Sequence, residues 1–165
     1  MHRRALAAVL LTLATFACTP PPPPPPPAPL PPPPPALTPE ELAAMQSVRA
    51  RELWDEGTAF GRQGRWAQAE RSYREAARLR PDSATYHMAL ATALLQQGRD
   101  GEAADALLAG IRAEEAETPP NHRLIAVDYE RLIQALERAN RLDEARSARE
   151  RQRLHRMLRD TAPPE

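Results

Sequence analysis

Residues 50–83 read ARELWDEGTAFGRQGRWAQAERSYREAARLRPDS, and they are the most informative part of the chain about its fold. It is rich in the helix-forming residues Ala, Leu, Arg, Glu and Gln. Small residues at Gly57 and Ala69 would let two antiparallel helices approach closely. The aromatic residues that would fill the space beside them are Phe60, Trp66 and Tyr73. The stretch therefore predicts a tightly packed helical hairpin.

The spacing of these residues resembles the tetratricopeptide repeat, a helical hairpin of about 34 residues that stacks into a solenoid. The matching positions are Leu53, Gly57, Phe60, Gly64, Trp66, Ala69, Tyr73, Ala76 and Pro81. The same frame recurs from Ala84 and, eight residues late, from Ala126. We therefore expect an all-α fold, a short solenoid of about six helices with repeats near 50–83, 84–117 and 126–159.

Glycine, proline and polar residues predict where the helices begin and end. Five breaks are expected, near residues 61–64, 80–83, 97–101, 118–121 and 139–141. Thr38, Pro39 and Glu41 have the spacing of an N-cap, a first-turn proline and a capping box, so the first helix should begin there. Asp82 is a candidate N-cap for the third helix.

The last helix should close the stack, because a solenoid needs a polar outer face on its terminal helix. Arg149 and Gln152 stand where a further repeat would require an aromatic residue and an alanine. The Arg-rich segment 146–159 also has the composition of a surface that contacts anionic headgroups. Glu150 lies close to Arg146 and Arg153, which favours an internally paired capping face.

The N-terminal region predicts a lipid anchor followed by a stiff spacer. Residues 1–17 combine two arginines with a short apolar run, and Cys18 is the only cysteine, so the segment resembles the signal sequence of a bacterial lipoprotein. Residues 18–37 would carry the lipidated cysteine and a spacer with 14 prolines, which should be an extended polyproline II segment. The helical domain is expected over 38–160.

The resemblance to lipoproteins implies attachment to the outer membrane, with the domain in the periplasm. Thr15 and Phe16 fit the lipobox poorly, whereas Thr15 and Ala17 also suit ordinary signal peptidase cleavage. A soluble secreted or periplasmic protein with an unmodified Cys18 is therefore the alternative location.

Tetratricopeptide repeats bind partners on the concave face that is lined by the first helix of each repeat, and the resemblance implies the same here. The implied groove residues are Arg51, Trp54, Thr58, Thr85, Met88, Thr92, Leu95, Val127, Glu130 and Gln134. Trp54 and Met88 hold equivalent positions and would accept an apolar or amphipathic segment of a partner. Alternatively, the long first helix folds partly over this face and Trp54 belongs to the core.

Composition and motifs give little support for catalysis, a cofactor, a metal or nucleic acid. The net charge is zero, and no Gly-rich phosphate loop or nucleophile elbow occurs. The four histidines fall in the signal segment and in three separate predicted helices, without an i, i+4 pair. Of these, only His87 is expected to face packed residues.

Two function hypotheses follow. The first is an envelope lipoprotein adaptor or assembly factor that binds an envelope protein or peptide, similar in kind to the pilotins that help secretins assemble. The second is a structural tether or oligomerising spacer between the outer membrane and peptidoglycan. Neither the partner's identity nor the oligomeric state follows from the sequence.

Overall fold

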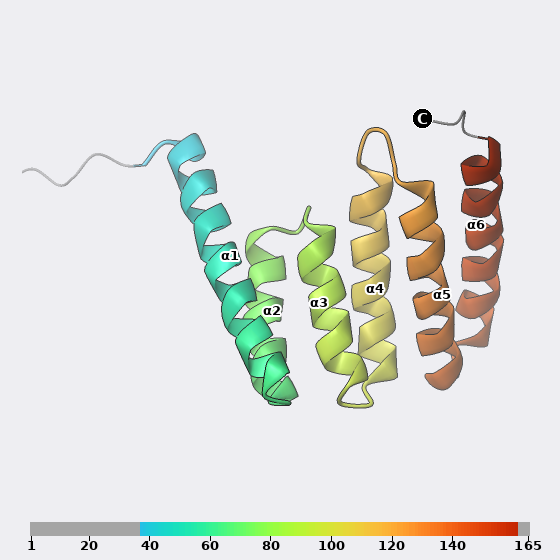
Figure 1. The fold of residues 1–165 in the computed structure, drawn as a ribbon, viewed down its shortest axis with the longest axis horizontal. Helices are drawn as coiled ribbons and strands as arrows, with labels where there is room; N and C mark the ends of the chain where they lie inside the picture. Colours follow the sequence, from blue (N-terminus) through green and yellow to red (C-terminus); the bar gives the residue numbers. More distant parts are fainter. Residues whose placement is uncertain (1–36, 162–165) are drawn as a thin grey trace, which may run out of the picture. The chain divides into compact units, whose positions relative to one another are not determined.

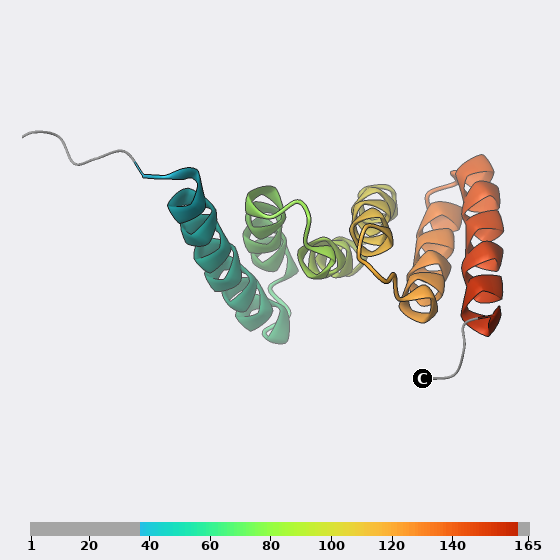
Figure 2. The ribbon, with the colours of Figure 1, turned by 90° about the horizontal axis from the view of Figure 1, so that it is seen from above.

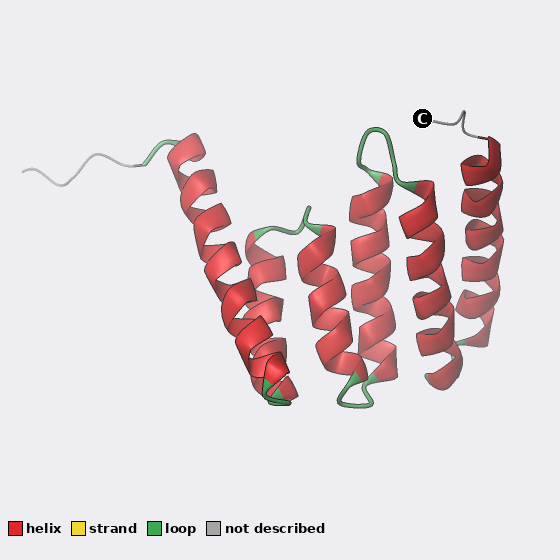
Figure 3. Cartoon of the chain, in the orientation of Figure 1, coloured by secondary structure: helices red, strands yellow, loops and turns green. Residues whose placement is uncertain are grey.

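A computed structural model describes residues 37–161, and the predicted signal peptide and nearly all of the predicted spacer lie outside these residues. The described part contains six helices and no strand (Figures 1 and 3). The helices are α1 (Pro39–Arg62), α2 (Trp66–Leu79), α3 (Ala84–Leu95), α4 (Asp100–Glu115), α5 (His122–Arg138) and α6 (Leu142–Thr161). The predicted all-α fold is confirmed.

A left-handed residue lies at the same position of each predicted repeat, in the turn that joins the two helices of the hairpin. Gly64, Gly98 and Asn140 have φ values of 70°, 70° and 57°. In each turn, the next backbone N–H donates to a carbonyl five residues earlier, which is the pattern that closes a helix C-terminus. These bonds are Arg65 to Phe60 at 3.0 Å, Arg99 to Leu94 at 3.0 Å and Arg141 to Leu136 at 2.8 Å. The repeat frame is therefore visible in the backbone itself.

Consecutive helices pack against one another in chain order, so the described helices form a row of three hairpins. In Figure 2, α3 and α5 lie on one side of this row, and α2 and α4 lie on the other. One apolar cluster runs from α2 to α6, and a smaller one joins α1 to α2. The largest fully buried side chains are Leu94, Leu107, Ile111, Ile125 and Tyr129.

The N-terminus of α1 has the predicted capping box. The backbone N–H of Glu41 donates to Thr38 Oγ1 at 3.2 Å, and the backbone N–H of Thr38 donates to Glu41 Oε2 at 2.8 Å. The hydrogen bond from the Thr38 backbone lowers the pKa of Glu41. The predicted cap of α3 is wrong, because Ser83 is the N-cap and Asp82 accepts hydrogen bonds from Arg80 at 2.8 and 2.9 Å.

The late start of the third repeat has a simple structural cause. Helix α4 has 16 residues and α2 has 14, and the connection after α4 has six residues (116–121) where the one after α2 has four (80–83). Helix α5 also begins at His122, four residues before the repeat frame at Ala126, and these three differences together give the eight residues. On α6, Arg149 is exposed and pairs with Glu137, as expected for a polar cap. Gln152 instead is buried and donates to the carbonyl of Ala126 at 3.0 Å, so it belongs to the α5–α6 contact.

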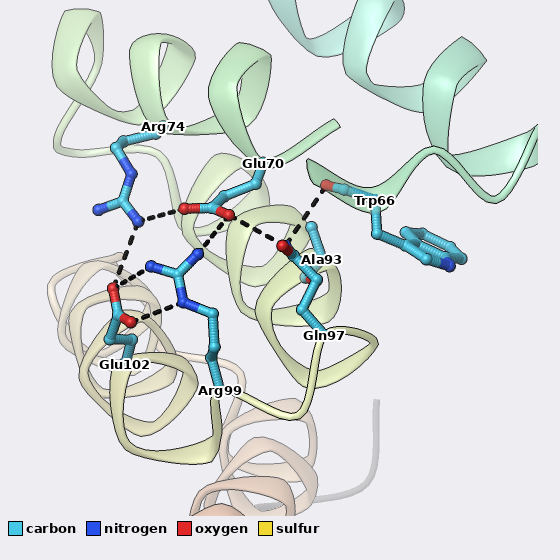
Figure 4. Close-up of polar contacts among 7 residues, drawn as sticks. All are labelled: Trp66, Glu70, Arg74, Ala93, Gln97, Arg99 and Glu102. Carbon is cyan, nitrogen blue, oxygen red and sulfur yellow. Dashed lines mark hydrogen bonds and ion pairs between the residues drawn. The ribbon is translucent and has the colours of Figure 1, made fainter. Parts of the chain in front are cut away.

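Glu70 joins the first repeat to the second through a cluster of polar contacts (Figure 4). Its carboxylate accepts hydrogen bonds from Arg74 at 2.6 Å, Gln97 at 2.9 Å and Arg99 at 2.5 Å. Burial by itself would raise the pKa of Glu70, but these hydrogen bonds and the charges of both arginines lower it. Glu102 pairs with Arg99 at 2.5 Å and completes the cluster.

Replacing Glu70 with alanine should lower the free energy of unfolding by about 2 kcal/mol, because Gln97 and Arg99 lose a buried acceptor. Glu102→Ala is the matched control, since Glu102 is exposed and its loss should cost less than about 1 kcal/mol. Urea denaturation of both variants measures the difference. An equal decrease in the free energy of unfolding of the two variants would show that Glu70 does not stabilise the contact between the first and second repeats.

Candidate functional site

A small hollow between α1 and α3 gathers three of the predicted groove residues. Arg51, Trp54 and Thr85 line it together with Ser83 and Tyr86, and its volume is about 270 Å³. The guanidinium carbon of Arg51 lies 6.0 Å from the centre of the Trp54 ring. This hollow and the neighbouring surface that continues through Thr92 on α3 to Arg131 on α5 are together called the odd-helix face.

Trp54 belongs both to this face and to the core. It is half-buried and packs against both apolar clusters. Helix α1 continues without a break from Pro39 to Arg62 and does not fold back over the hollow. The part of the indole that remains exposed can therefore contact a partner, while the remainder helps to hold α1 in place.

Four predicted groove residues on α1 and α3 besides Trp54 are half-buried, and they make contacts inside the fold. Thr58 accepts a hydrogen bond from the hydroxyl of Tyr73 at 3.2 Å. Met88 packs against Gly110 of α4, where a Cβ atom would lie only 2.8 Å from Met88 Cε. Leu95 packs against the larger apolar cluster. Thr92 faces α5 and accepts a hydrogen bond from Arg131.

Arg131 is the residue of α5 that reaches α3. Its guanidinium donates to Thr92 Oγ1 at 3.1 Å and to Asp128 Oδ1 at 3.2 Å. Sequence reasoning chose its neighbour Glu130 and missed Arg131. Tyr86, which lines the hollow, was also missed, although both residues lie next to predicted groove positions in the repeat frame.

The predicted groove residues of α5 do not join the hollow between α1 and α3. Val127 is exposed. Glu130 and Gln134 line a polar groove of about 370 Å³ between α5 and α6. The carboxylate of Glu130 lies 3.8 Å from the guanidinium of Arg156 on α6. Of the ten predicted residues, three therefore line the hollow and two line this groove, while the other five line neither.

Two buried carboxyl groups lie beneath the odd-helix face. Glu114 on α4 is 6% exposed, and its Oε2 has no hydrogen-bond partner among the described residues. Burial, together with the nearby charge of Asp128, raises the pKa of Glu114 to about 7. Burial also raises the pKa of Asp128, against the opposing effect of its hydrogen bond from Arg131. One carboxyl group in this pair therefore titrates near neutral pH.

The structure brings together two histidines that the sequence placed apart. His122 Nδ1 on α5 lies 3.0 Å from His155 Nδ1 on α6. His155 Nε2 lies 3.1 Å from Glu115 Oε1, which also accepts a hydrogen bond from the Tyr129 hydroxyl at 2.9 Å. His155 is buried, whereas His87 is half-buried, so the expectation that only His87 faces packed residues is wrong.

Among residues 37–161, no group of three or more His, Cys, Asp or Glu side chains is arranged to hold a metal ion. None of the helices in this part of the chain is both long and apolar enough to span a membrane.

Comparison with known proteins places this geometry in a structural class. Residues 55–120 match the family model described as tetratricopeptide repeat. No curated protein matches the chain in sequence.

Solved structures with a similar fold include the N-terminal domain of stress-induced protein-1 from C. elegans. That structure has a TM-score of 0.59 and 22% sequence identity, and the match covers 67% of this chain and 86% of that one. The Arabidopsis OM64 TPR domain is 22% identical over 67% of this chain and 98% of that one, with a TM-score of 0.37. The family match and the C. elegans structure together identify the described helices as a tetratricopeptide-repeat fold.

Proposed function

We propose that this protein is a lipid-anchored adaptor of the bacterial cell envelope, and that its odd-helix face binds a segment of a partner protein. Cys18 carries the lipid in this proposal, and the proline-rich residues that follow it hold the helical domain away from the membrane. The repeat fold supports the binding role, because stacked repeats present extended surfaces to their partners. The anchor rests on the sequence alone, because residues 1–36 lie outside the described part.

The hollow beside Trp54 is the observation that carries the binding proposal. It combines an exposed guanidinium, an aromatic ring and a hydroxyl, from Arg51, Trp54 and Thr85. An amphipathic or extended peptide can place an apolar side chain against the indole while its polar groups meet Arg51 and Thr85. Arg131 and Thr92 continue the surface from α3 to α5.

The binding proposal predicts that Arg51→Glu and Thr85→Glu each weaken partner binding at least about tenfold, or about 1.4 kcal/mol. Both residues are exposed, so their substitution should leave the fold intact, whereas Trp54→Ala would also remove packing. Arg71→Glu, an exposed change on α2, is the matched control. Envelope proteins captured by the wild type and by each variant are compared by quantitative mass spectrometry.

The supporting result is a specific protein that both odd-helix variants lose and that Arg71→Glu retains. If all variants capture the same proteins in the same amounts, the odd-helix face is not the binding surface. In that case the alternative role as a tether or oligomerising spacer becomes the better account.

The anchor is tested separately by Cys18→Ser. The wild type should incorporate labelled palmitate and fractionate with membranes, and the variant should lose the label, because Cys18 provides the only thiol in the chain. The helical domain should retain its helicity by circular dichroism. A wild-type protein without label, released in soluble form, would favour the secreted alternative.

A further inference from the structure

A second hollow, lined mainly by apolar surface, lies between α4, α5 and α6 and shares no lining residue with the hollow beside Trp54. It has a volume of about 330 Å³, and Tyr129, Leu132 and Leu136 of α5 are among its lining residues. Leu108 on α4 and Ala148 on α6 line it as well. Helices α4 and α6 both pack against α5, which positions these side chains around one space.

The repeat frame shows why this space is open. Its counterpart between α2 and α4 is occupied by the cluster of Glu70, Arg74, Arg99 and Glu102 (Figure 4). In the next repeat, alanine and leucine stand in place of the two α2 members of that cluster: Glu70 corresponds to Ala104 and Arg74 to Leu108. The polar cluster that fills the space between α2 and α4 therefore has no full equivalent between α4 and α6, where an apolar hollow remains.

The charges around the hollow differ between its two ends. At one end, Arg141 is held by Asp105 and by Glu144, each at 2.6 Å. The other end has Arg112, which makes no ion pair among residues 37–161, and Arg151, whose guanidinium lies 3.8 Å from Glu115. Glu115 is also engaged by Tyr129 and His155. A positive charge therefore remains available at the Arg112 end.

From this geometry we infer that the hollow binds an aliphatic carboxylate, with the chain on Leu108, Leu132 and Leu136 and the anionic head at Arg112 and Arg151. A volume of about 330 Å³ corresponds to roughly ten water-sized groups, and hence to about ten carbon atoms. Ligand pockets in proteins begin near this size and combine an apolar lining with a few polar groups. This site is separate from the proposed partner-binding face, and either can be wrong without the other.

Titration of the full chain with decanoate tests the inference, using Cys18→Ser in detergent-free buffer so that attached lipid cannot compete. Isothermal titration calorimetry should detect one site for decanoate. The double variant Ala104→Glu with Leu108→Arg introduces the residues found at the equivalent positions Glu70 and Arg74. It should fill the hollow with polar side chains and weaken decanoate binding at least tenfold. Arg112→Gln should weaken decanoate binding about tenfold and leave decanol binding unchanged.

The variants also separate binding from folding. Arg112 is exposed and Leu108 is half-buried, so Arg112→Gln and Leu108→Gln provide folded test proteins if the double variant fails to fold. Loss of decanoate binding in these variants supports the site. No binding to the wild type, or equal binding to wild type and folded variants, overturns it. Equal affinity for decanoate, decanol and decylamine overturns the role assigned to the two arginines.

Discussion

Replacing Gly57 with alanine is expected to lower the free energy of unfolding by about 3 kcal/mol. A Cβ atom at this position would lie 2.6 Å from Tyr73 Cε1 and 2.7 Å from Tyr73 Cδ1. The ring is buried, and its hydroxyl donates to Thr58, so it cannot move aside freely. Overpacking of about 3 kcal/mol and a hydrogen bond of about 1 kcal/mol oppose a gain of about 1 kcal/mol in helix propensity.

Gly101→Ala is the matched control, because it makes the same change inside a helix where space is available. The nearest side-chain atom to an added Cβ at Gly101 is Ala139 Cβ, at an ordinary contact distance of 3.9 Å. This variant should be as stable as the wild type or more stable by up to about 1 kcal/mol. Urea denaturation of the two variants gives the comparison. A Gly57→Ala protein as stable as Gly101→Ala would contradict the close packing of α1 on Tyr73.

Replacing Glu114 with glutamine should stabilise the protein above pH 7 by about 3 kcal/mol. Burial and the charge of Asp128 raise the pKa of Glu114 from its ordinary value of 4.5 to about 7. Each pKa unit corresponds to about 1.4 kcal/mol between the two protonation states. Glutamine carries no charge at any of these pH values, so the variant does not bear the cost of an ionised carboxylate in this buried position.

The sign of the pH dependence follows from the same shift. Below pH 4.5 the carboxyl group of Glu114 is protonated in both the folded and the unfolded chain, and the raised pKa has no cost. Between pH 4.5 and about 7 only the unfolded chain ionises, so the free energy of unfolding falls as the pH rises. Above pH 7 this loss is complete.

Urea denaturation at pH 5, 7 and 8.5 measures this effect. The wild type should lose stability from pH 5 to 8.5, and Glu114→Gln should lose less, with Asp128 accounting for part of the remaining dependence. Glu117→Gln changes an exposed carboxylate nearby and should keep most of the wild-type pH dependence. A wild-type stability that does not change between pH 5 and 8.5 would show that Glu114 ionises without cost in the folded protein.

The fold was predictable because its determinants are local and repeat along the chain. Gly64, Gly98 and Asn140 supply a left-handed turn at the same repeat position, and the small residues near them allow each hairpin to close. The capping box at Thr38 was equally visible, since all of its members lie within four residues. The predicted N-cap at Asp82 was wrong because the carboxylate of Asp82 accepts hydrogen bonds from Arg80, two residues away.

The site was less predictable, because it depends on contacts between residues far apart in the chain. Repeat positions identified Arg51, Trp54 and Thr85, which meet in one hollow. They could not show that Arg131 reaches Thr92, 39 residues away, or that His122 meets His155. The sequence shows that Ala104 stands at the repeat position equivalent to Glu70. That this difference leaves an apolar hollow could be seen only from the arrangement of α4, α5 and α6.

Photocrosslinking from position 85 tests whether a partner protein binds the odd-helix face, because Thr85 is exposed and lines the hollow beside Trp54. A photoreactive residue is introduced there and, as a control, at the exposed position 71 on α2, and both proteins are irradiated in intact cells. We expect one partner protein to crosslink from position 85, to be absent from position 71 and to be lost when Arg51→Glu is added. A partner that crosslinks equally from both positions, or from position 71 alone, would contradict binding at the odd-helix face.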